Sequence, residues 1–344
     1  MPEAPRPEDK FKRCASCVLA GCGERVLLDA AGRCGLCAAP PRPAKPLLES
    51  DLLKLLAAHR GKGGYDCLLL CSGGRDSVSS LYYARKRYRL NPLVLTFDNG
   101  FEHPAAVANA RRAAEKLGAD WLYYRSPLMK EMYAEALRSG EGFPLCALCS
   151  LWYMGVVYDT AERYGLPLII AGWTAGQSTP GEADPAFAAL CEGVSPFVER
   201  MRAAYPKYAA FPRSMEELRR GRPFSRKAVI ASPHWFLDGS PEEYGPLMAR
   251  ELGWEPVGYS YPAGSTNCPV SLLGSWLSLR RYGFTHFHVE MSSLIRAGKL
   301  GREEALEKLE LDLSAPGAAA ALKPALAALG LTPGELGLTG EGWR

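Results

Sequence analysis

The sequence predicts an α/β protein built on a doubly wound parallel sheet. Four apolar runs, at residues 67–71, 93–97, 120–124 and 168–171, are too short to form helices and suit buried strands. Glycine-containing turns follow the first, second and fourth runs, and segments with helical spacing separate the runs. Strands that alternate with helices form βαβ units, in which ligands sit beyond the carboxyl ends of the strands.

Two Cys-x2-Cys pairs precede the predicted sheet. Cys14 and Cys17 form the first pair, and Cys34 and Cys37 form the second after sixteen intervening residues. Each pair places two thiolates on a tight turn, and four thiolates complete the tetrahedral shell that Zn²⁺ prefers. We therefore expect a structural zinc ribbon, with Cys22 as a spare or alternative ligand. The competing interpretation is a set of four free thiols.

The remaining elements follow in order along the chain. Helices are expected at residues 47–59, 75 to about 88, 104–117 and 128–138, in two pieces within 272–311, and near 319–329. Residues 176–262 show no sustained periodicity and are expected to form a substrate lid or a partner surface. The predicted divisions are a ribbon with a Pro-rich linker (1–45), the sheet domain (46–190), a helical region that completes the site (191–314) and an Ala- and Gly-rich tail (315–344).

Composition favours a cytoplasmic protein. The 344 residues are 47% hydrophobic, which suits a full core, yet no uncharged apolar run reaches the length of a membrane span. The first thirteen residues lack the hydrophobic segment of a signal peptide. In a reducing compartment, eleven cysteines with paired spacing point to metal or redox chemistry rather than disulfides. The net charge of +4 permits RNA binding but falls short of a dedicated nucleic-acid-binding protein.

The segment SGGRDS, residues 72–77, joins the first strand to the first helix of the sheet domain. Its Gly-Gly turn exposes backbone N–H groups at a helix N-terminus, which suits an anion such as phosphate. Ser72 and Ser77 add hydroxyl groups, and Arg75 adds a fixed positive charge. Neither a Walker A loop nor a GxGxxG motif is present. The competing interpretation is a strand–turn–helix junction without a ligand.

SGGRDS resembles the PP-loop, SGGxDS, of the N-type ATP pyrophosphatases, members of the adenine nucleotide alpha-hydrolase-like superfamily with the HUP fold. The resemblance implies cleavage of ATP to AMP and pyrophosphate, with Mg²⁺ held with the help of Asp76, while a substrate oxygen is adenylated. Arg75 stands where lysine is usual. The residues that the resemblance assigns to the nucleotide are Ser72, Gly73, Gly74, Arg75, Asp76, Ser77, Thr96, Phe97, Asp98 and Gly172. Asp98 and Asn99 could instead be simple turn residues.

Three further cysteines form a possible cluster-binding set, with two of them between the third and fourth predicted strands. Cys146 and Cys149 share one turn, and Cys268 follows far downstream in STNCPV. Three thiolates can hold three irons of a [4Fe-4S] cluster and leave the fourth iron open for hydrosulfide or substrate sulfur. The trio also resembles the cluster-binding cysteines of PP-loop tRNA thiolases. The alternatives are a zinc site completed by His103 or His234, a persulfide-carrying pair, and inert buried thiols.

The chain as a whole is similar to N-acetyl sugar amidotransferase-like PP-loop proteins. The similarity rests on the ribbon, the loop, the middle Cys-x2-Cys and the RYGF…SSLIRAGKLGREEALEKLE segment, and it covers residues 11 to about 311. It implies ammonia-dependent amidotransfer to a nucleotide-linked N-acetyl sugar with a separate glutaminase. Cys268 has no regular counterpart in those sugar enzymes, which puts a direct transfer of their activity in doubt.

The function predicted first is an ATP-dependent adenylating transferase that replaces a substrate oxygen with sulfur. The predicted cofactors are ATP, Mg²⁺, Zn²⁺ and a [4Fe-4S] cluster, and the predicted partners are a tRNA or small-molecule acceptor and a sulfur donor. The residues expected to carry the chemistry are Arg75, Asp76, Cys146, Cys149 and Cys268. The alternatives are the amidotransferase, with its glutaminase partner, and a non-catalytic nucleotide-binding scaffold. A homodimer is compatible with the sequence, and no membrane association is expected.

Two further groups of polar residues are expected to be structural. His286 and His288 alternate with apolar residues, and such histidines more often pack and form hydrogen bonds than catalyse. A basic cluster is interpreted as a solvated helix end and loop rather than a nucleic-acid patch. Its members are Arg219, Arg220, Arg222, Arg226 and Lys227.

Overall fold

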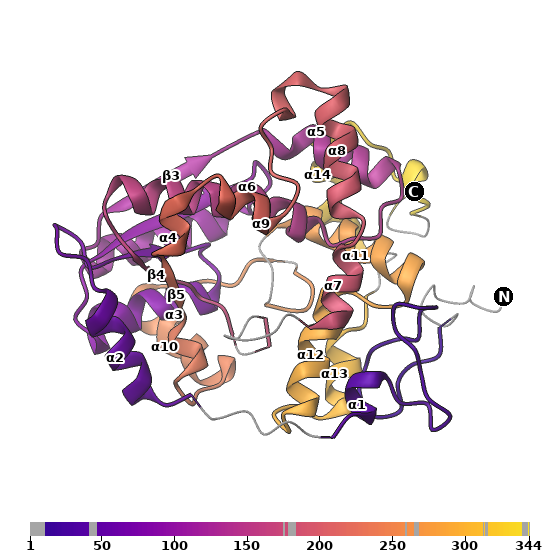
Figure 1. Ribbon diagram of the computed structural model, residues 1–344, viewed down its shortest axis with the longest axis horizontal. Helices are drawn as coiled ribbons and strands as arrows, with labels where there is room; N and C mark the ends of the chain where they lie inside the picture. Colours follow the sequence, from indigo (N-terminus) through magenta and orange to yellow (C-terminus); the bar gives the residue numbers. More distant parts are fainter. Residues whose placement is uncertain are drawn as a thin grey trace.

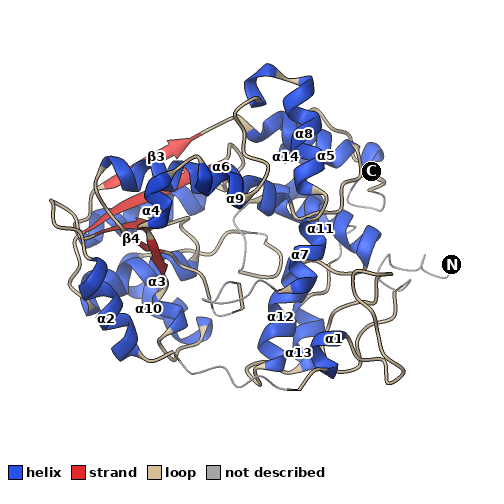
Figure 2. Ribbon diagram, in the orientation of Figure 1, coloured by secondary structure: helices blue, strands red, loops and turns tan. Residues whose placement is uncertain are grey.

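Five parallel strands form one sheet at the centre of the fold, in the order β3-β2-β1-β4-β5 (Figures 1 and 2). The computed structural model describes residues 11–40, 47–174, 176–177, 184–258, 260–264, 268–311, 313, 316–338 and 343. The strands are β1 (Cys67–Leu70), β2 (Pro92–Asp98), β3 (Trp121–Arg125), β4 (Leu168–Ile170) and β5 (Val229–Ala231). The four predicted strands are confirmed, and β5 arises from a region that showed no periodicity.

Both faces of the sheet are covered by helices, so the doubly wound α/β architecture is confirmed. Strands β1 and β2 are buried along their whole lengths, as expected where helices cover both faces. One face packs against α2 (Glu49–His59), α3 (Arg75–Tyr82), α4 (Pro104–Leu117) and α10 (Pro241–Leu252). The opposite face packs against α6 (Leu145–Arg163) and α9 (Met215–Arg220). Helix α3 continues into the π-helix η2 (Tyr83–Arg87), close to the predicted end.

The second half of the molecule is a helical region with its own apolar core, seen to the right of the sheet in Figure 1. Its helices are α5 (Met129–Arg138), α8 (Val194–Ala204), α11 (Pro269–Tyr282), α12 (His286–Arg296), α13 (Arg302–Lys308) and α14 (Pro316–Leu329). Helix α6 joins the halves, because Leu145 and Leu148 enter this core while Met154 and Val157 pack on the sheet. The predicted pair of helices within 272–311 is wrong in number, since residues around Gly283 and Gly298 divide the segment into three.

Segment 191–314 contributes to both halves of the molecule. It supplies β5 and α10 to the sheet, besides the helices of the second core. Short helical turns complete the described chain: η3 (Pro206–Tyr208), η4 (Pro223–Arg226), η5 (Pro233–Trp235) and η6 (Gly334–Leu336). None of the helices in the described ranges combines the length and the apolar character needed to cross a lipid bilayer. Residues 1–10, most of the predicted linker (41–46) and the tail end at 339–342 lie outside the described residues.

The N-terminal cysteine-rich segment packs on the helical region rather than on the sheet. Short antiparallel bridges and helix α1 (Gly35–Ala38) shape it, and its apolar residues contact α7 (Pro185–Cys191) and α12. The Val18 N–H donates to Ser292 Oγ of α12 at 3.3 Å. From α13, Arg302 donates to the carbonyl oxygens of Cys17 at 3.2 Å and of Cys14 at 3.3 Å. These contacts hold the segment against α12 and α13 (Figure 1).

Candidate active site

The loop between β1 and α3 depends on glycine at its second position. Gly73 has a positive φ of 80°, and a Cβ there would fall on the carbonyl oxygen of Ala106 in α4. The Gly73 carbonyl oxygen accepts hydrogen bonds from Trp254 Nε1 at 3.1 Å and from Asn109 Nδ2 at 3.3 Å. The loop is therefore fixed between α4 and the segment that follows α10.

Two serines and a second glycine complete the first turn of α3. Ser77 Oγ donates to the Gly74 carbonyl oxygen at 3.0 Å and lies 3.2 Å from Ser72 Oγ. Gly172, just after β4, approaches so closely that a Cβ there would lie 2.5 Å from Ser77 Cα. The carboxyl end of β4 thus meets the loop after β1, where phosphate binding was predicted. Residue 175, which follows β4 in the chain, lies outside the described residues.

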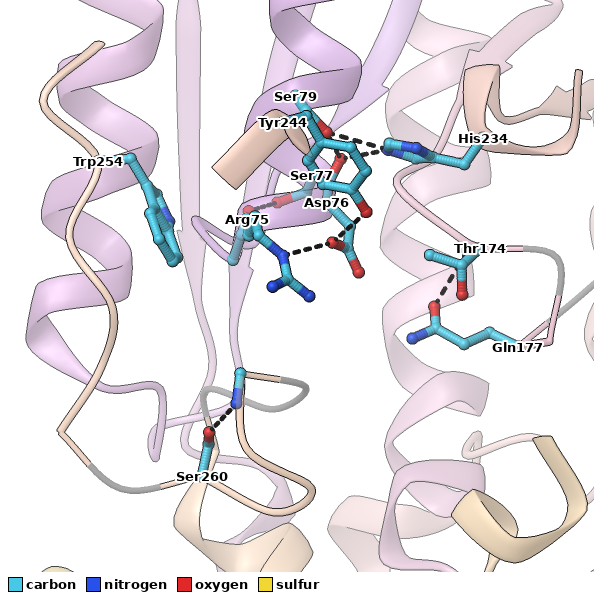
Figure 3. Close-up of polar contacts among 12 residues, drawn as sticks. Arg75, Asp76, Ser77, Ser79, Thr174, Gln177, His234, Tyr244, Trp254 and Ser260 are labelled. Atoms are coloured by element: carbon cyan, nitrogen blue, oxygen red, sulfur yellow. Dashed lines mark hydrogen bonds and ion pairs between the residues drawn. The ribbon is translucent and has the colours of Figure 1, made fainter. Parts of the chain in front are cut away.

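Arg75 and Asp76 are held by side chains that come from residues 229–252 (Figure 3). Arg75 Nε donates to Asp76 Oδ1 at 3.2 Å, and the Tyr244 hydroxyl donates to the same oxygen at 2.8 Å. His234 Nε2 lies 2.9 Å from the Asp76 carbonyl oxygen and 3.1 Å from Ser79 Oγ. The region without periodicity therefore covers the loop and fixes its two charged residues.

The residues predicted to contact adenosine form the end of β2 and are largely engaged with protein groups. Thr96 Oγ1 donates to the Cys71 carbonyl oxygen at 2.6 Å and accepts from Trp121 Nε1 at 2.8 Å. Phe97 stacks on Tyr124 with ring centroids 5.9 Å apart. The one proton of the Thr96 hydroxyl is therefore engaged within the protein.

Asp98 is a buried residue that organises the turn after β2. Its carboxylate accepts from the Gly100 N–H at 2.7 Å, the Glu102 N–H at 3.3 Å and the Tyr123 hydroxyl at 2.5 Å. Arg125 forms an ion pair with it at 3.1 Å. These contacts give Asp98 the turn-forming role that was one of its two interpretations, and its predicted contact with adenosine stays a prediction.

Cys146, Cys149 and Cys268 line one cavity of about 230 Å³ together with Ser72 of the loop. Cys146 and Cys149 come from the first turns of α6, and Cys268 is the N-cap residue of α11. Other polar groups that line the cavity are Asn99, Glu102, Tyr133, Ser150 and Ser271. The fold thus brings the distant cysteine to the pair, and it brings the trio to the predicted phosphate loop. Residues 265–267 of STNCPV lie outside the described residues.

Asn99 contacts three other polar side chains in the wall of the cavity. Its Nδ2 lies within donor distance of three acceptors, at 3.6 Å from Cys149 Sγ, 3.5 Å from Cys268 Sγ and 3.2 Å from the Tyr133 hydroxyl oxygen. Cys146 Sγ donates to Ser271 Oγ at 3.3 Å. Amide and hydroxyl groups around the sulfur atoms would stabilise negative charge on them.

The protonation states in this cavity are dominated by burial. Burial raises the pKa of Cys149 to about 12 and also raises the pKa of Cys146 and Cys268. Burial, followed by the charge of Asp98, raises the pKa of Glu102 to about 8. Without a positive group in the cavity, the three thiols therefore stay protonated at neutral pH, and a metal centre would favour the thiolates.

The histidines considered as fourth zinc ligands have other roles. His103 Nδ1 accepts from the Ala105 N–H at 3.2 Å and caps α4, and His234 sits on α3. Neither lines the cysteine cavity. In the described part of the chain, the ribbon cysteines are the one group of three or more Cys, His, Asp and Glu whose ligand atoms lie within 4.8 Å of one another. The cavity thiols therefore do not gather around a single ion as the ribbon thiols do.

The ribbon cysteines are arranged as a tetrahedral metal site requires. The sulfur atoms of Cys17 and Cys34 are 3.8 Å apart, and all four sulfurs meet within 4.8 Å. Cys14 Sγ accepts from the backbone N–H groups of Ser16 at 3.4 Å and Cys34 at 3.2 Å, as metal-bound thiolates do in such turns. The hydrogen bond from the Cys34 thiol lowers the pKa of Cys17 and raises that of Cys34. Cys22 is outside this group.

The remaining polar predictions fall on structural positions. His288 Nδ1 lies 3.0 Å from Thr285 Oγ1 and accepts from the Thr285 N–H in a capping box at the start of α12. Burial lowers the pKa of His286 to about 4, so it is neutral at physiological pH. In the basic cluster, Arg222 pairs with Asp159 at 2.8 Å and Arg220 pairs with Glu216 at 2.7 Å.

Several residues at the site were missed by sequence reasoning. Tyr244, Trp254 and Glu290 touch or face the loop, while Glu102 and Tyr133 line the cavity. Glu102 lies just beyond the carboxyl end of β2, which is a usable signal because ligands bind at strand ends. The other four come from helices and a connection whose position no local pattern reveals.

Comparisons with known proteins give distant matches. No family model matches the chain. It is 24% identical over 275 residues to the uncharacterized protein MJ1599 of Methanocaldococcus jannaschii, across 79% of this chain and 81% of that protein. Among solved structures it is similar to the U34-tRNA thiolase NcsA from Methanococcus maripaludis with its [4Fe-4S] cluster, at 15% identity and a TM-score of 0.36, across 88% of this chain and 91% of that one. A likeness at this level carries no argument about activity, and neither match assigns a family.

Proposed function

We propose that this protein is a PP-loop adenylating transferase that cleaves ATP to AMP and pyrophosphate and replaces a substrate oxygen with sulfur. The observation that carries the proposal is the shared cavity. Ser72 of the phosphate loop and the thiols of Cys146, Cys149 and Cys268 line the same space of about 230 Å³. An oxygen activated at the loop would therefore lie beside the group that displaces it.

The loop residues perform the activation. A substrate oxygen attacks the α-phosphate of ATP, the bond from that phosphorus to the bridging oxygen of pyrophosphate breaks, and the negative charge passes to the leaving pyrophosphate. Backbone N–H groups at the start of α3 and the Arg75 guanidinium stabilise that charge. Asp76 would help to hold Mg²⁺, which neutralises the phosphates. Hydrosulfide then attacks the carbon that carries the adenylated oxygen, a C–S bond forms, and the C–O bond breaks so that the oxygen leaves as part of AMP.

The cavity suits a [4Fe-4S] cluster bound by Cys146, Cys149 and Cys268. Three thiols converge from α6 and α11, but they do not close around one ion, and Asn99 lies within hydrogen-bonding distance of two of the sulfurs. When bound, such a cluster supplies an open iron position for hydrosulfide. Around it, Asn99 and Ser271 would orient the sulfur ligands. A persulfide on the Cys146–Cys149 pair is the alternative source of sulfur.

The acceptor is a carbonyl or amide oxygen of a tRNA nucleoside or of a small molecule, and a separate sulfur donor is required. Transfer of ammonia to a nucleotide-linked N-acetyl sugar, with a glutaminase partner, uses the same activated oxygen and is the second candidate. Its supporting observation is the ribbon, which packs on the helical region. The sequence places this ribbon before the phosphate loop, in the same order as in the amidotransferase-like proteins that the chain resembles. A scaffold that binds nucleotide without catalysis is the third.

The test is an isotope-incorporation assay with anaerobically reconstituted protein. The full chain is incubated with MgATP, labelled sulfide or labelled ammonium, and either bulk tRNA or a small-molecule extract. We expect AMP formation and label from sulfide in one acceptor fraction, both lost in Cys268→Ala. Incorporation from ammonium alone would replace sulfur transfer with amidotransfer. Absence of AMP with every acceptor fraction would contradict both enzymatic functions.

A further inference from the structure

We propose that helix α10 tunes the phosphate loop, with Tyr244 as a positioning residue that holds Asp76 and Arg75 so that their free atoms face the magnesium pyrophosphate part of ATP. The inference rests on the proposed function, because it assigns a positioning residue to the proposed ATP site. It concerns a helix that no sequence motif connects with the loop.

One carboxylate oxygen of Asp76 accepts hydrogen bonds from both Tyr244 and Arg75. Asp76 Oδ1 accepts from the Tyr244 hydroxyl at 2.8 Å and from Arg75 Nε at 3.2 Å. The guanidinium carbon of Arg75 also lies 5.7 Å from the centroid of the Tyr244 ring, within the range of a cation–π contact. Figure 3 shows the three side chains meeting at this oxygen. Tyr244 therefore fixes Asp76 through its hydroxyl and Arg75 through its ring.

The atoms that remain available are those that a metal–phosphate group needs. Among the described residues, Asp76 Oδ2 and the terminal nitrogens Nη1 and Nη2 of Arg75 have no hydrogen-bond partner. A paired guanidinium edge binds two phosphate oxygens at once, and a carboxylate oxygen is a preferred ligand of Mg²⁺. The pair thus offers complementary charge to magnesium pyrophosphate, while the shared Oδ1 keeps the two groups in a fixed relation.

The neighbouring glycine of α10 leaves room for the arginine. A Cβ at Gly245 would lie 3.2 Å from Arg75 Cδ, closer than an ordinary contact, so a larger residue would push the arginine stem aside. Burial, followed by the charge of Asp76, raises the pKa of Tyr244, which keeps its hydroxyl protonated as a donor. Tyr244 thus contacts the guanidinium of Arg75, and Gly245 leaves space for its stem. Arg75 stands at the loop position where PP-loops usually have lysine.

The test is titration calorimetry of the full chain with inorganic pyrophosphate and Mg²⁺. Tyr244→Phe removes only the hydroxyl, and Gly245→Ala removes no polar group but crowds Arg75. We expect Tyr244→Phe to weaken pyrophosphate binding about tenfold, the loss typical of a hydrogen bond to a charged group, and Gly245→Ala to weaken it as well by displacing Arg75. Tyr88→Phe is the matched control, because its hydroxyl lies 3.0 Å from the Glu49 carboxylate, away from the loop. It should bind pyrophosphate as the wild type does.

The decisive comparison is made in an Arg75→Lys background. Lysine has no Nε–H donor for Asp76 Oδ1, so Tyr244→Phe should weaken binding there by less than about threefold, a non-additive result. An equal loss in both backgrounds, or no loss in either, would overturn the positioning role of Tyr244. Wild-type protein that binds neither pyrophosphate nor ATP would overturn the proposed function as well. Wild-type binding with an unaffected Tyr244→Phe variant would overturn this inference alone.

Discussion

The two cysteine sites of this protein differ in how they are closed. In the ribbon, four sulfurs meet within 4.8 Å, and the backbone of the segment is tied by hydrogen bonds to side chains of α12 and α13. In the cavity, three thiols from α6 and α11 face an open space that also contains Ser72. A full set of four thiols is typical of structural metal sites, whereas an incomplete set leaves a position for a reactant. We therefore expect the first site to contribute to stability, and we propose the second as the site of chemistry.

The largest effect should come from opening the ribbon. Cys17→Ser removes one of four ligands, so we expect loss of zinc and a decrease of several kcal/mol in the free energy of unfolding, because metal binding and folding are coupled in such segments. Zinc analysis and thermal unfolding measure both. Cys22→Ser, which changes a cysteine outside the group of four, is the control and should keep the metal. Unchanged unfolding in Cys17→Ser would remove the structural role of the ribbon.

Opening the cavity should give the opposite pattern. Cys149→Ser is expected to abolish iron and sulfide binding while zinc stays bound. When both proteins are compared without cluster, the free energy of unfolding should change by less than about 1 kcal/mol, because serine nearly preserves the size of the side chain. Iron, sulfide and zinc analysis of the same sample checks this. Cys191→Ser, a half-buried thiol at the end of α7, is the matched control. Retained iron in Cys149→Ser would show that the cavity does not hold the cluster.

Helix α12 packs against the ribbon, and its Glu290, which is affected by the charge of Asp76 in the loop, gives a pH-dependent prediction. Burial, followed by the charge of Asp76, raises the pKa of Glu290 to about 7. The folded state therefore binds more protons than the unfolded state between about pH 4.5 and 7, so this residue makes stability fall as pH rises through that window. Glu290→Gln should remove the effect and be more stable than wild type at pH 8, by at most about 3 kcal/mol.

Denaturant unfolding at pH 5 and pH 8 measures that difference. Glu115→Gln, on the exposed side of α4, is the control and should show no such pH-dependent gap. A gap between wild type and Glu290→Gln that stays constant with pH would contradict the raised pKa.

The smallest expected effect concerns the contact between the ribbon and α12. Ser292→Ala removes the acceptor of the Val18 N–H, so a buried donor loses its partner at a cost of about 1 kcal/mol. The midpoint of thermal unfolding should fall by a few degrees, while binding of pyrophosphate stays unchanged. Ser293→Ala, at the next position of the same helix, is the control. Equal unfolding of the two variants would show that this contact does not secure the ribbon.

The parts of the fold that the sequence predicted are those with strong local patterns. The loop at 72–77, the two Cys-x2-Cys pairs and the strands β1 and β2 follow from spacing, glycine and runs of apolar residues. Helix α6 was missed, since it is buried on one side by the sheet and on the other by the helical core, and it therefore lacks an amphipathic stripe. Strand β5 has only three residues and gave no signal.

Part of the candidate site was predicted from the sequence, and the contacts made by distant residues were missed. The convergence of Cys268 with Cys146 and Cys149 was inferred from residue type and is found in the cavity. The contacts of Tyr244 and His234 with Asp76 span 168 and 158 residues, and no local pattern encodes a contact over such a separation. The need for glycine at position 245 likewise becomes visible only in the structure, where α10 lies against Arg75.

Metal and sulfide analysis of wild-type protein purified without oxygen, with a visible absorption spectrum, tests the central claim most directly. We predict about four irons and four sulfides per chain in addition to one zinc, with a broad visible absorption band that disappears in Cys268→Ala. Zinc alone, at one per chain, before and after anaerobic reconstitution with iron and sulfide would contradict the account. It would leave the ribbon as the metal site and favour amidotransfer at the loop.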